Sequence, residues 1–290
     1  MSDRKSKYIM VEGKEIHFSE WGNPTNPTII CVHGLTRNGR DFDILASELS
    51  KSYYVICPDI LGRGLSQWSS LPDEEYCFEF YEKLIVGLIN GLGVKKLSWI
   101  GTSMGGAIGI RAAGGTLKSQ ITHLFINDIG AGPTEEALKN AATSPSEGVQ
   151  AILTYTANPP KFETMSQLMN YYQQIYKAFG ITHEEEWITF TEGSARRTDN
   201  GSFTPDYDPN IVKQFNHATD LLLWNQWDEI SAKVTVLRGE LSDILPLDTV
   251  EEMTKRGPEF KLHEITGVGH APGLNTPEQI GLIKQFLEEI

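Results

Sequence analysis

The 290-residue sequence contains little cysteine and no long apolar run. Its three cysteines, Cys31, Cys57 and Cys77, are odd in number and lack paired spacing, which argues against a disulfide framework and against a Cys-x-x-Cys metal or redox site. No apolar stretch approaches the roughly 20 residues that a bilayer-spanning helix needs. The charged residues 1–7 are not followed by the apolar core of a secretion signal. We therefore expect a cytoplasmic protein that does not bind membranes.

Positive charge is also scarce, since 25 Lys and Arg residues stand against 38 Asp and Glu residues, a formal net charge of −13. This balance argues against a basic surface for nucleic acid or anionic lipid. The sequence has no His-Glu-x-x-His zinc motif, no complete dinucleotide fingerprint and no P-loop. We expect chemistry on a small-molecule substrate without a cofactor or a metal, carried out by a monomer or homodimer.

Strand and helix patterns alternate over most of the chain. The short apolar runs are typical of strands that are buried on both faces of a parallel sheet, and the amphipathic segments between them predict helices. An antiparallel hairpin over residues 8–20 opens the sheet. The remaining predicted strands cover 28–32, 54–57, 97–100, 121–128, 233–239 and 260–265, and the predicted helices cover 41–49, 78–92, 249–255 and 277–289.

The alternation is interrupted between residues 131 and 229. This section carries helical patterns rich in aromatic residues, and Gly130–Pro133 is a plausible hinge into it. The simplest interpretation is an α/β core formed by residues 1–130 and 230–290, with residues 131–229 inserted as a helical lid or cap.

The segment Gly101–Gly105 has the pattern Gly-x-Ser-x-Gly between an apolar strand and a helix that begins with small residues. The pentapeptide alone is a weak signal in a chain with 27 glycines, and the strand before it and the helix after it strengthen it. A sharp strand-to-helix turn of this kind holds a serine in a backbone conformation that non-glycine residues avoid. We predict that Ser103 is a nucleophile and that the backbone N–H of Met104 stabilises an oxyanion.

A serine hydroxyl needs a general base to accept its proton. Among the seven histidines, His270 lies in a loop with two glycines before it and a proline after it, between the last predicted strand and the last helix. The other six lie in strand patterns, in the inserted section or directly after the strand over 28–32. We predict that His270 is the base.

The base in turn needs a carboxylate to orient its ring. Asp243 follows the strand that ends near Leu237, and the chain order Ser103, Asp243, His270 is the order expected for this kind of elbow. Asp128 is the alternative acid, because it ends the strand that follows the nucleophile helix. Glu240 is a third and weaker candidate. Our prediction is Asp243.

A second oxyanion donor is expected in the loop after residues 28–32. In His33-Gly34-Leu35 the glycine permits close backbone approach, and we predict that the Leu35 N–H is this donor. The loop over residues 59–66 is interpreted as a structural border of the cleft. Four tryptophans are candidates to line an apolar pocket, namely Trp68, Trp187, Trp224 and Trp227, although for each residue alone packing in the lid or the core is favoured.

Taken together, these motifs resemble the α/β-hydrolase fold superfamily over essentially the whole chain. The matching residues are His33-Gly34, Asp59-x-x-Gly62-x-Gly64-x-Ser66, Gly101 to Gly106, Asp243 and Gly269-His270. The resemblance implies an α/β fold with an eight-stranded, mostly parallel sheet and a helical cap inserted after the sixth strand.

The resemblance also limits the reactions that we expect this protein to catalyse. Haloalkane dehalogenases and epoxide hydrolases of this fold carry aspartate at the position of Ser103, so those activities are disfavoured. A serine there implies a hydrolase that cleaves a carboxylic ester of a small or medium substrate through an acyl-enzyme. Two alternatives stay open: a carbon–carbon bond hydrolase of ring-fission products with the same triad, and a non-catalytic binding protein of this fold. Candidates for every triad position argue against the latter.

Overall fold

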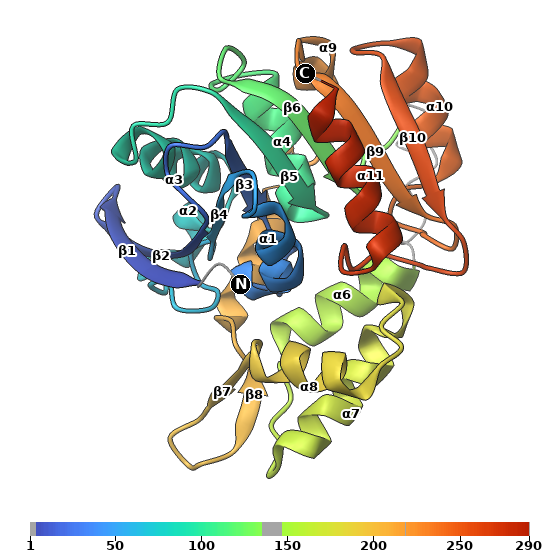
Figure 1. Ribbon diagram of the computed structural model, residues 1–290. Coiled ribbons are helices and arrows are strands. Elements are labelled where there is room, and N and C mark those ends of the chain that lie inside the picture. Colours follow the sequence, from blue (N-terminus) through green and yellow to red (C-terminus); the bar gives the residue numbers. More distant parts are fainter. Residues whose placement is uncertain (1–3, 135–146, 218, 290) are drawn as a thin grey trace.

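The computed structural model describes residues 4–134, 147–217 and 219–289. Eight strands form one twisted sheet in the order β1–β2–β4–β3–β5–β6–β9–β10 (Figure 1). The first three strands in this order pair antiparallel and all later neighbours pair parallel. The strands are β1 (Lys5–Val11), β2 (Lys14–Trp21), β3 (Thr28–Val32), β4 (Tyr54–Pro58), β5 (Leu97–Thr102), β6 (Ile121–Asn127), β9 (Lys233–Gly239) and β10 (Phe260–Ile265).

Helices cover both faces of this sheet, which explains why its central strands are apolar throughout. Because side chains alternate along a strand, Ile29 packs on one face and Ile30 on the other. The face of Ile29 is covered by α1 (Asp43–Leu49) and α11 (Pro277–Glu288). The opposite face is covered by α3 (Phe78–Gly91), α4 (Met104–Ala113), α9 (Trp224–Asp228) and α10 (Leu247–Lys255). The predicted fold class is confirmed, and the three cysteines are buried without disulfide bonds.

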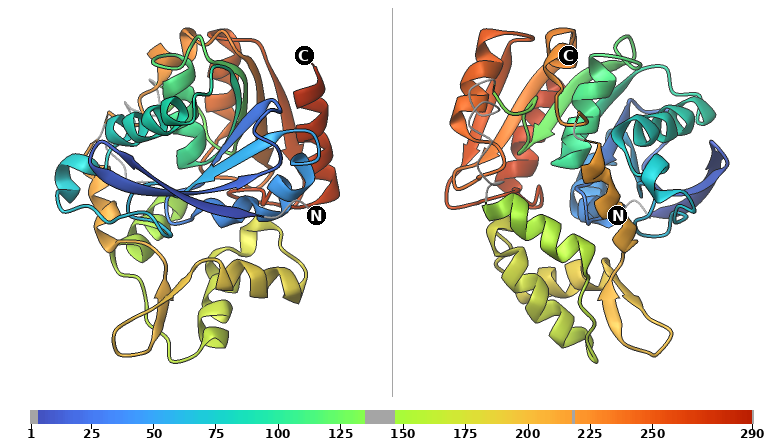
Figure 2. Two further views of the ribbon diagram at one scale, coloured as in Figure 1. Left: turned by 60° about the vertical axis from the view of Figure 1, so that its left-hand side comes forward. Right: turned by 180° about the vertical axis from the view of Figure 1, so that it is seen from behind.

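A mostly helical section connects β6 to β9, and its residues 147–205 lie to one side of the sheet (Figures 1 and 2). Of the predicted cap, residues 135–146 and 218 lie outside the described residues. The aromatic pattern that predicted this section forms a core of its own, in which Leu168, Tyr172, Tyr176 and Trp187 are buried. Its elements before α9 are α6 (Glu147–Ala157), α7 (Met165–Ile175), η2 (Lys177–Phe179), α8 (Glu184–Glu192), β7 (Ala195–Arg197), β8 (Phe203–Pro205) and η3 (Pro209–Asn216).

The antiparallel pair β7–β8 was not expected from the sequence, which predicts only a polar loop at residues 196–202. The loop is the turn of this hairpin, and each strand is three residues long. Three residues are too few to produce a readable alternation of apolar and polar positions. Pairing between the two strands across this turn therefore decides the structure here.

Candidate active site

Ser103 lies at the sharp turn between β5 and α4. Its backbone has φ 50° and ψ −116°, a strained conformation for a residue with a side chain. The flanking glycines are required by space, because a Cβ on Gly101 would lie 2.3 Å from the Gly105 carbonyl oxygen, and one on Gly105 would lie 1.9 Å from the Val32 carbonyl oxygen. The close approach of β3, β5 and α4 thus holds the serine at the carboxyl edge of the sheet, as the motif predicted.

The structure brings Ser103 together with His270 and Asp128. The Oγ of Ser103 is 2.8 Å from Nε2 of His270, and Nδ1 of His270 is 2.7 Å from Oδ2 of Asp128. Asp128 is completely buried, and its Oδ1 accepts a hydrogen bond of 2.9 Å from the backbone N–H of Gly239. With Nδ1–H donating to the carboxylate, Nε2 can accept the proton of the serine hydroxyl.

The two candidate acids lie at different distances from the ring of His270. The carboxylate at Nδ1 of His270 belongs to Asp128, the alternative, and not to Asp243. Asp128 directly follows β6, which is hydrogen-bonded to the nucleophile strand β5, whereas Asp243 follows β9, one strand further away. Asp243 is exposed and lines the same pocket as His270. Glu240, the third candidate, accepts a hydrogen bond from the Gly267 N–H.

His33 determines the direction of the Leu35 amide. It is fully buried, Nδ1 lies 2.7 Å from the Gly34 carbonyl oxygen, and Nε2 accepts a hydrogen bond from Ile60 N–H. Burial lowers the pKa of His33 to about 4, so the ring is neutral near pH 7. The Gly34 carbonyl and the Leu35 N–H point in opposite directions from one planar trans peptide. Holding the carbonyl therefore orients the N–H.

A cavity of about 460 Å³ lies beside the serine. Its wall combines Gly34, Leu35 and Ser103 of the core with Tyr155 and Tyr176 of the cap section. The four tryptophan candidates are not among its lining residues. Trp227 is fully buried in the core and Trp187 belongs to the cap core, which agrees with the favoured alternative of packing. Trp224 donates to the Pro133 carbonyl, and Trp68 stacks with Arg196. Large aromatic residues pack wherever a core forms, so their presence did not locate the pocket.

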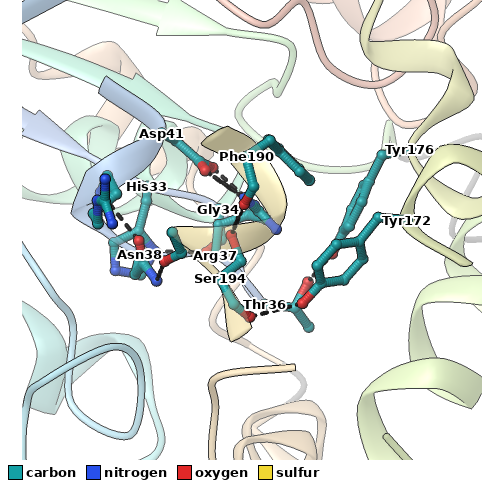
Figure 3. A network of polar contacts seen from close by, with 12 residues as sticks. His33, Gly34, Thr36, Arg37, Asn38, Asp41, Tyr172, Tyr176, Phe190 and Ser194 are labelled. Atoms are coloured by element: carbon teal, nitrogen blue, oxygen red, sulfur yellow. Dashed lines mark hydrogen bonds and ion pairs between the residues drawn. The ribbon is translucent and has the colours of Figure 1, made fainter. Parts of the chain in front are cut away.

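Arg37 is a pocket residue that the sequence analysis missed. It is 4% exposed and contacts Asp41 of the core and Ser194 of the cap section (Figure 3). The only sequence signal was its position three residues after the glycine of His33-Gly34. Sequence alone gave no reason to expect that a cation at this position is buried.

None of residues 59–66 is among the lining residues of this cavity, and the loop contacts the site through Ile60, whose N–H donates to His33. The carboxylate of Asp59 accepts hydrogen bonds from the backbone N–H groups of Gly39 and Leu65 and from Nδ1 of His17. Nε2 of His17 in turn lies 2.6 Å from the hydroxyl of Ser6. A second Ser–His–Asp series thus exists, but Ser6 is an exposed residue within the regular strand β1.

Within the described ranges, no group of three His, Cys, Asp or Glu side chains is arranged to hold a metal ion. None of the helices described there is long and apolar enough to cross a bilayer.

The sequence pattern of the α/β hydrolase fold matches residues 27–277. This chain belongs to the α/β hydrolase fold family. Among its relatives, a 3-hydroxybutyrate-oligomer hydrolase of Cupriavidus necator is 38% identical over 93% of this chain and 91% of its own length. An esterase of Mycobacterium tuberculosis is 23% identical over 93% of this chain and 85% of its own length.

Solved structures support the same assignment for this α/β hydrolase. An α/β hydrolase from Novosphingobium aromaticivorans superposes with a TM-score of 0.86 at 29% identity and full coverage of both chains. A Rickettsia typhi protein superposes with a TM-score of 0.87 at 32% identity, covering 99% of each chain. The predicted family and fold are confirmed, and the protein is a hydrolase.

Proposed function

We propose that this protein is a serine ester hydrolase with Ser103 as nucleophile, His270 as general base and acid, and Asp128 as the orienting carboxylate. The hydrogen-bonded series Ser103–His270–Asp128 carries the proposal, because it joins a nucleophile, a proton acceptor and a buried negative charge through two successive hydrogen bonds. The strained serine backbone, held by the two flanking glycines, supports the same role.

In the first half of the reaction, Oγ of Ser103 attacks the ester carbonyl carbon while Nε2 of His270 accepts the hydroxyl proton. The oxyanion that forms is stabilised by the backbone N–H groups of Leu35 and Met104, the second of which is the first residue of α4 and lacks an intrahelical acceptor. The alcohol leaves with the proton from His270. Water then attacks the acyl-enzyme through the same base and regenerates Ser103.

The proposed substrates are esters of short hydroxy acids. The Cupriavidus necator relative is named for the hydrolysis of 3-hydroxybutyrate oligomers, and its similarity extends over 93% of this chain. The cavity of about 460 Å³ is within the range that holds small to medium ligands. We further propose that residues 131–229 act as a lid over this cavity, because Tyr155, Tyr176 and Phe179 from that section form part of its wall.

The test compares Ser103→Ala with Ser6→Ala on p-nitrophenyl esters of increasing chain length and on the 3-hydroxybutyrate dimer. Both serines are hydrogen-bonded to a histidine Nε2, so Ser6→Ala is a matched control. Ser103→Ala should reduce kcat by about 10³-fold or more, with little change in Tm. Ser6→Ala should retain wild-type turnover.

Retention of more than a tenth of the activity in Ser103→Ala would contradict the assignment. A wild-type protein that hydrolyses no ester but cleaves a vinylogous diketone acid would instead favour carbon–carbon bond hydrolysis. That outcome has a specific basis, since a 2-hydroxy-6-oxononadienedioate hydrolase of Pseudomonas putida is 22% identical over 91% of this chain.

A further inference from the structure

The guanidinium of Arg37 is held rigidly between the core and the cap section. Its Nε donates to Oδ2 of Asp41 at 3.0 Å, and its Nη2 donates to Oδ1 of Asp41 and to the hydroxyl of Ser194, each at 2.6 Å. The Ser194 hydroxyl donates to the Phe190 carbonyl, so its oxygen is an acceptor for Arg37. The face of the guanidinium lies 3.6 Å from the Phe190 ring centre and 5.0 Å from that of Tyr176 (Figure 3).

The third nitrogen of this group has no acceptor within the described part of the chain. Nη1 of Arg37 is buried and has no hydrogen-bond partner among the residues that the structure describes. The aromatic rings stack on the guanidinium face and cannot accept its in-plane N–H groups. The hydroxyl of Tyr176 is itself paired with Thr36 Oγ1. A buried cationic donor without an acceptor is costly, and a ligand oxygen would remove that cost.

Arg37 is also close to the nucleophile. A Cβ placed on Gly34 would lie 3.7 Å from Cβ of Ser103 and 3.9 Å from Cγ of Arg37, so the two side chains flank the same glycine. Both residues line the same cavity. A carboxylate at Arg37 and an ester carbonyl at Ser103 would therefore belong to one substrate bound in this cavity.

We propose that Nη1 of Arg37 binds a carboxylate of the substrate, so that this hydrolase selects acidic esters with a free carboxylate near the scissile bond. A carboxylate matches the donor better than a neutral oxygen does, because a charge-assisted hydrogen bond is the stronger interaction. This inference rests on the proposed function and specifies its substrate class: a hydroxy acid dimer with an unesterified acid end. Arg37 is a binding residue in this reaction, whereas Ser103, His270 and Asp128 perform the chemistry.

The experiment uses the 3-hydroxybutyrate dimer and its methyl ester, in which one methyl group removes the carboxylate charge, and follows only cleavage of the ester bond that joins the two hydroxybutyrate units. Wild-type kcat/KM should be higher for the free acid by at least about 10-fold. In Arg37→Met this preference should fall by about 10- to 100-fold, with the loss mainly in KM. Arg40→Met is the control: Arg40 donates to Asp43, is not among the lining residues of this cavity, and should leave the acid-to-ester ratio at its wild-type value.

Two outcomes would overturn the proposal. One is a wild-type enzyme that hydrolyses the methyl ester as well as the acid or better, a result that needs no variant to fold. The other is an equal loss on both substrates in folded Arg37→Met, which would mean that Arg37 only supports the cap.

A binding measurement separates this inference from the proposed function. 3-Hydroxybutyrate should raise the Tm of Ser103→Ala, and adding Arg37→Met should abolish the rise. If no ester is hydrolysed and this Arg37-dependent shift is present, the carboxylate site stands and the proposed reaction fails. If the Tm shift is absent and hydrolysis depends on Ser103, the proposed reaction stands and the carboxylate site fails.

Discussion

At the residue scale, Ser6 and Ser103 are hydrogen-bonded in the same order to a histidine and a buried aspartate. The two series differ in what surrounds the serine. Ser103 has a strained backbone, begins a helix and lines a cavity, whereas Ser6 is an exposed residue of β1. A hydrogen-bonded Ser–His–Asp series therefore indicates chemistry only where backbone donors and space for a substrate meet it.

The identity of the acid is tested at this scale by comparing Asp128→Asn with Asp243→Asn. Asparagine at position 128 would favour the wrong tautomer of His270 and would no longer stabilise the imidazolium, so kcat should fall by about 10³- to 10⁴-fold. The kcat of Asp243→Asn should fall much less, because Asp243 is exposed and the carboxylate at Nδ1 of His270 is that of Asp128. A larger loss in Asp243→Asn than in Asp128→Asn would reverse our assignment of the acid.

At the scale of elements, the turn between β5 and α4 depends on the absence of two side chains. A Cβ on Gly105 would collide with the backbone of β3, and no rotamer change can relieve a clash with a carbonyl oxygen 1.9 Å away. The strand, the helix and the neighbouring strand must separate to accept it. Such a movement would displace Ser103 from His270.

Gly105→Ala should therefore lower stability by about 2 to 4 kcal/mol and reduce ester hydrolysis together with it. Gly281→Ala is the matched control, since Gly281 lies in α11 with nothing within 4 Å of its Cβ position. That variant should gain about 0.5 to 1 kcal/mol from helix propensity and keep full activity. Urea unfolding and the p-nitrophenyl assay measure both effects. If Gly105→Ala is as stable as the wild type, the turn between β5 and α4 can accept a Cβ by a small backbone shift, and the prediction is wrong.

At the scale of the whole molecule, the buried His33 and the partly buried Asp206 make opposing contributions to the pH dependence of stability. The pKa of His33 is lowered from 6.5 to about 4 by burial, so the unfolded chain binds more protons between these values and stability falls as the pH decreases. Burial, with a smaller contribution from Asp59, raises the pKa of Asp206 from 3.8 to about 6. The folded chain then binds more protons in that window, and stability rises as the pH decreases.

Asp206→Asn should separate the two contributions. At pH 7.5 the variant should be more stable than wild type by several degrees in Tm, because it removes a partly buried and desolvated charge. Between pH 6.5 and 4.5 it should lose more stability than wild type, since the opposing contribution of Asp206 is gone and that of His33 remains. Thermal unfolding across this range provides the measurement. A pH profile parallel to that of the wild type would contradict the shifted pKa of Asp206.

The sequence by itself determined the sheet, the elbow and the loop that carries His270. Apolar runs predicted the buried strands, the two glycines around Ser103 marked the turn, and the glycines before His270 marked a loop that reaches the cleft. These features are local, because strand burial, backbone conformation and loop flexibility are encoded in a few consecutive residues. The short β7–β8 hairpin had no comparable local signal, since its pairing joins residues on both sides of a turn.

Only the tertiary structure decided which acid meets His270 and what surrounds Arg37. Asp128 and Asp243 both follow strands of one sheet, and the choice between them depends on the lateral order of β5, β6 and β9 and on which carboxylate is buried. The partners of Arg37 are Asp41, four residues away, and Ser194, 157 residues away. Contacts between such distant segments arise from packing, which no short stretch of sequence encodes.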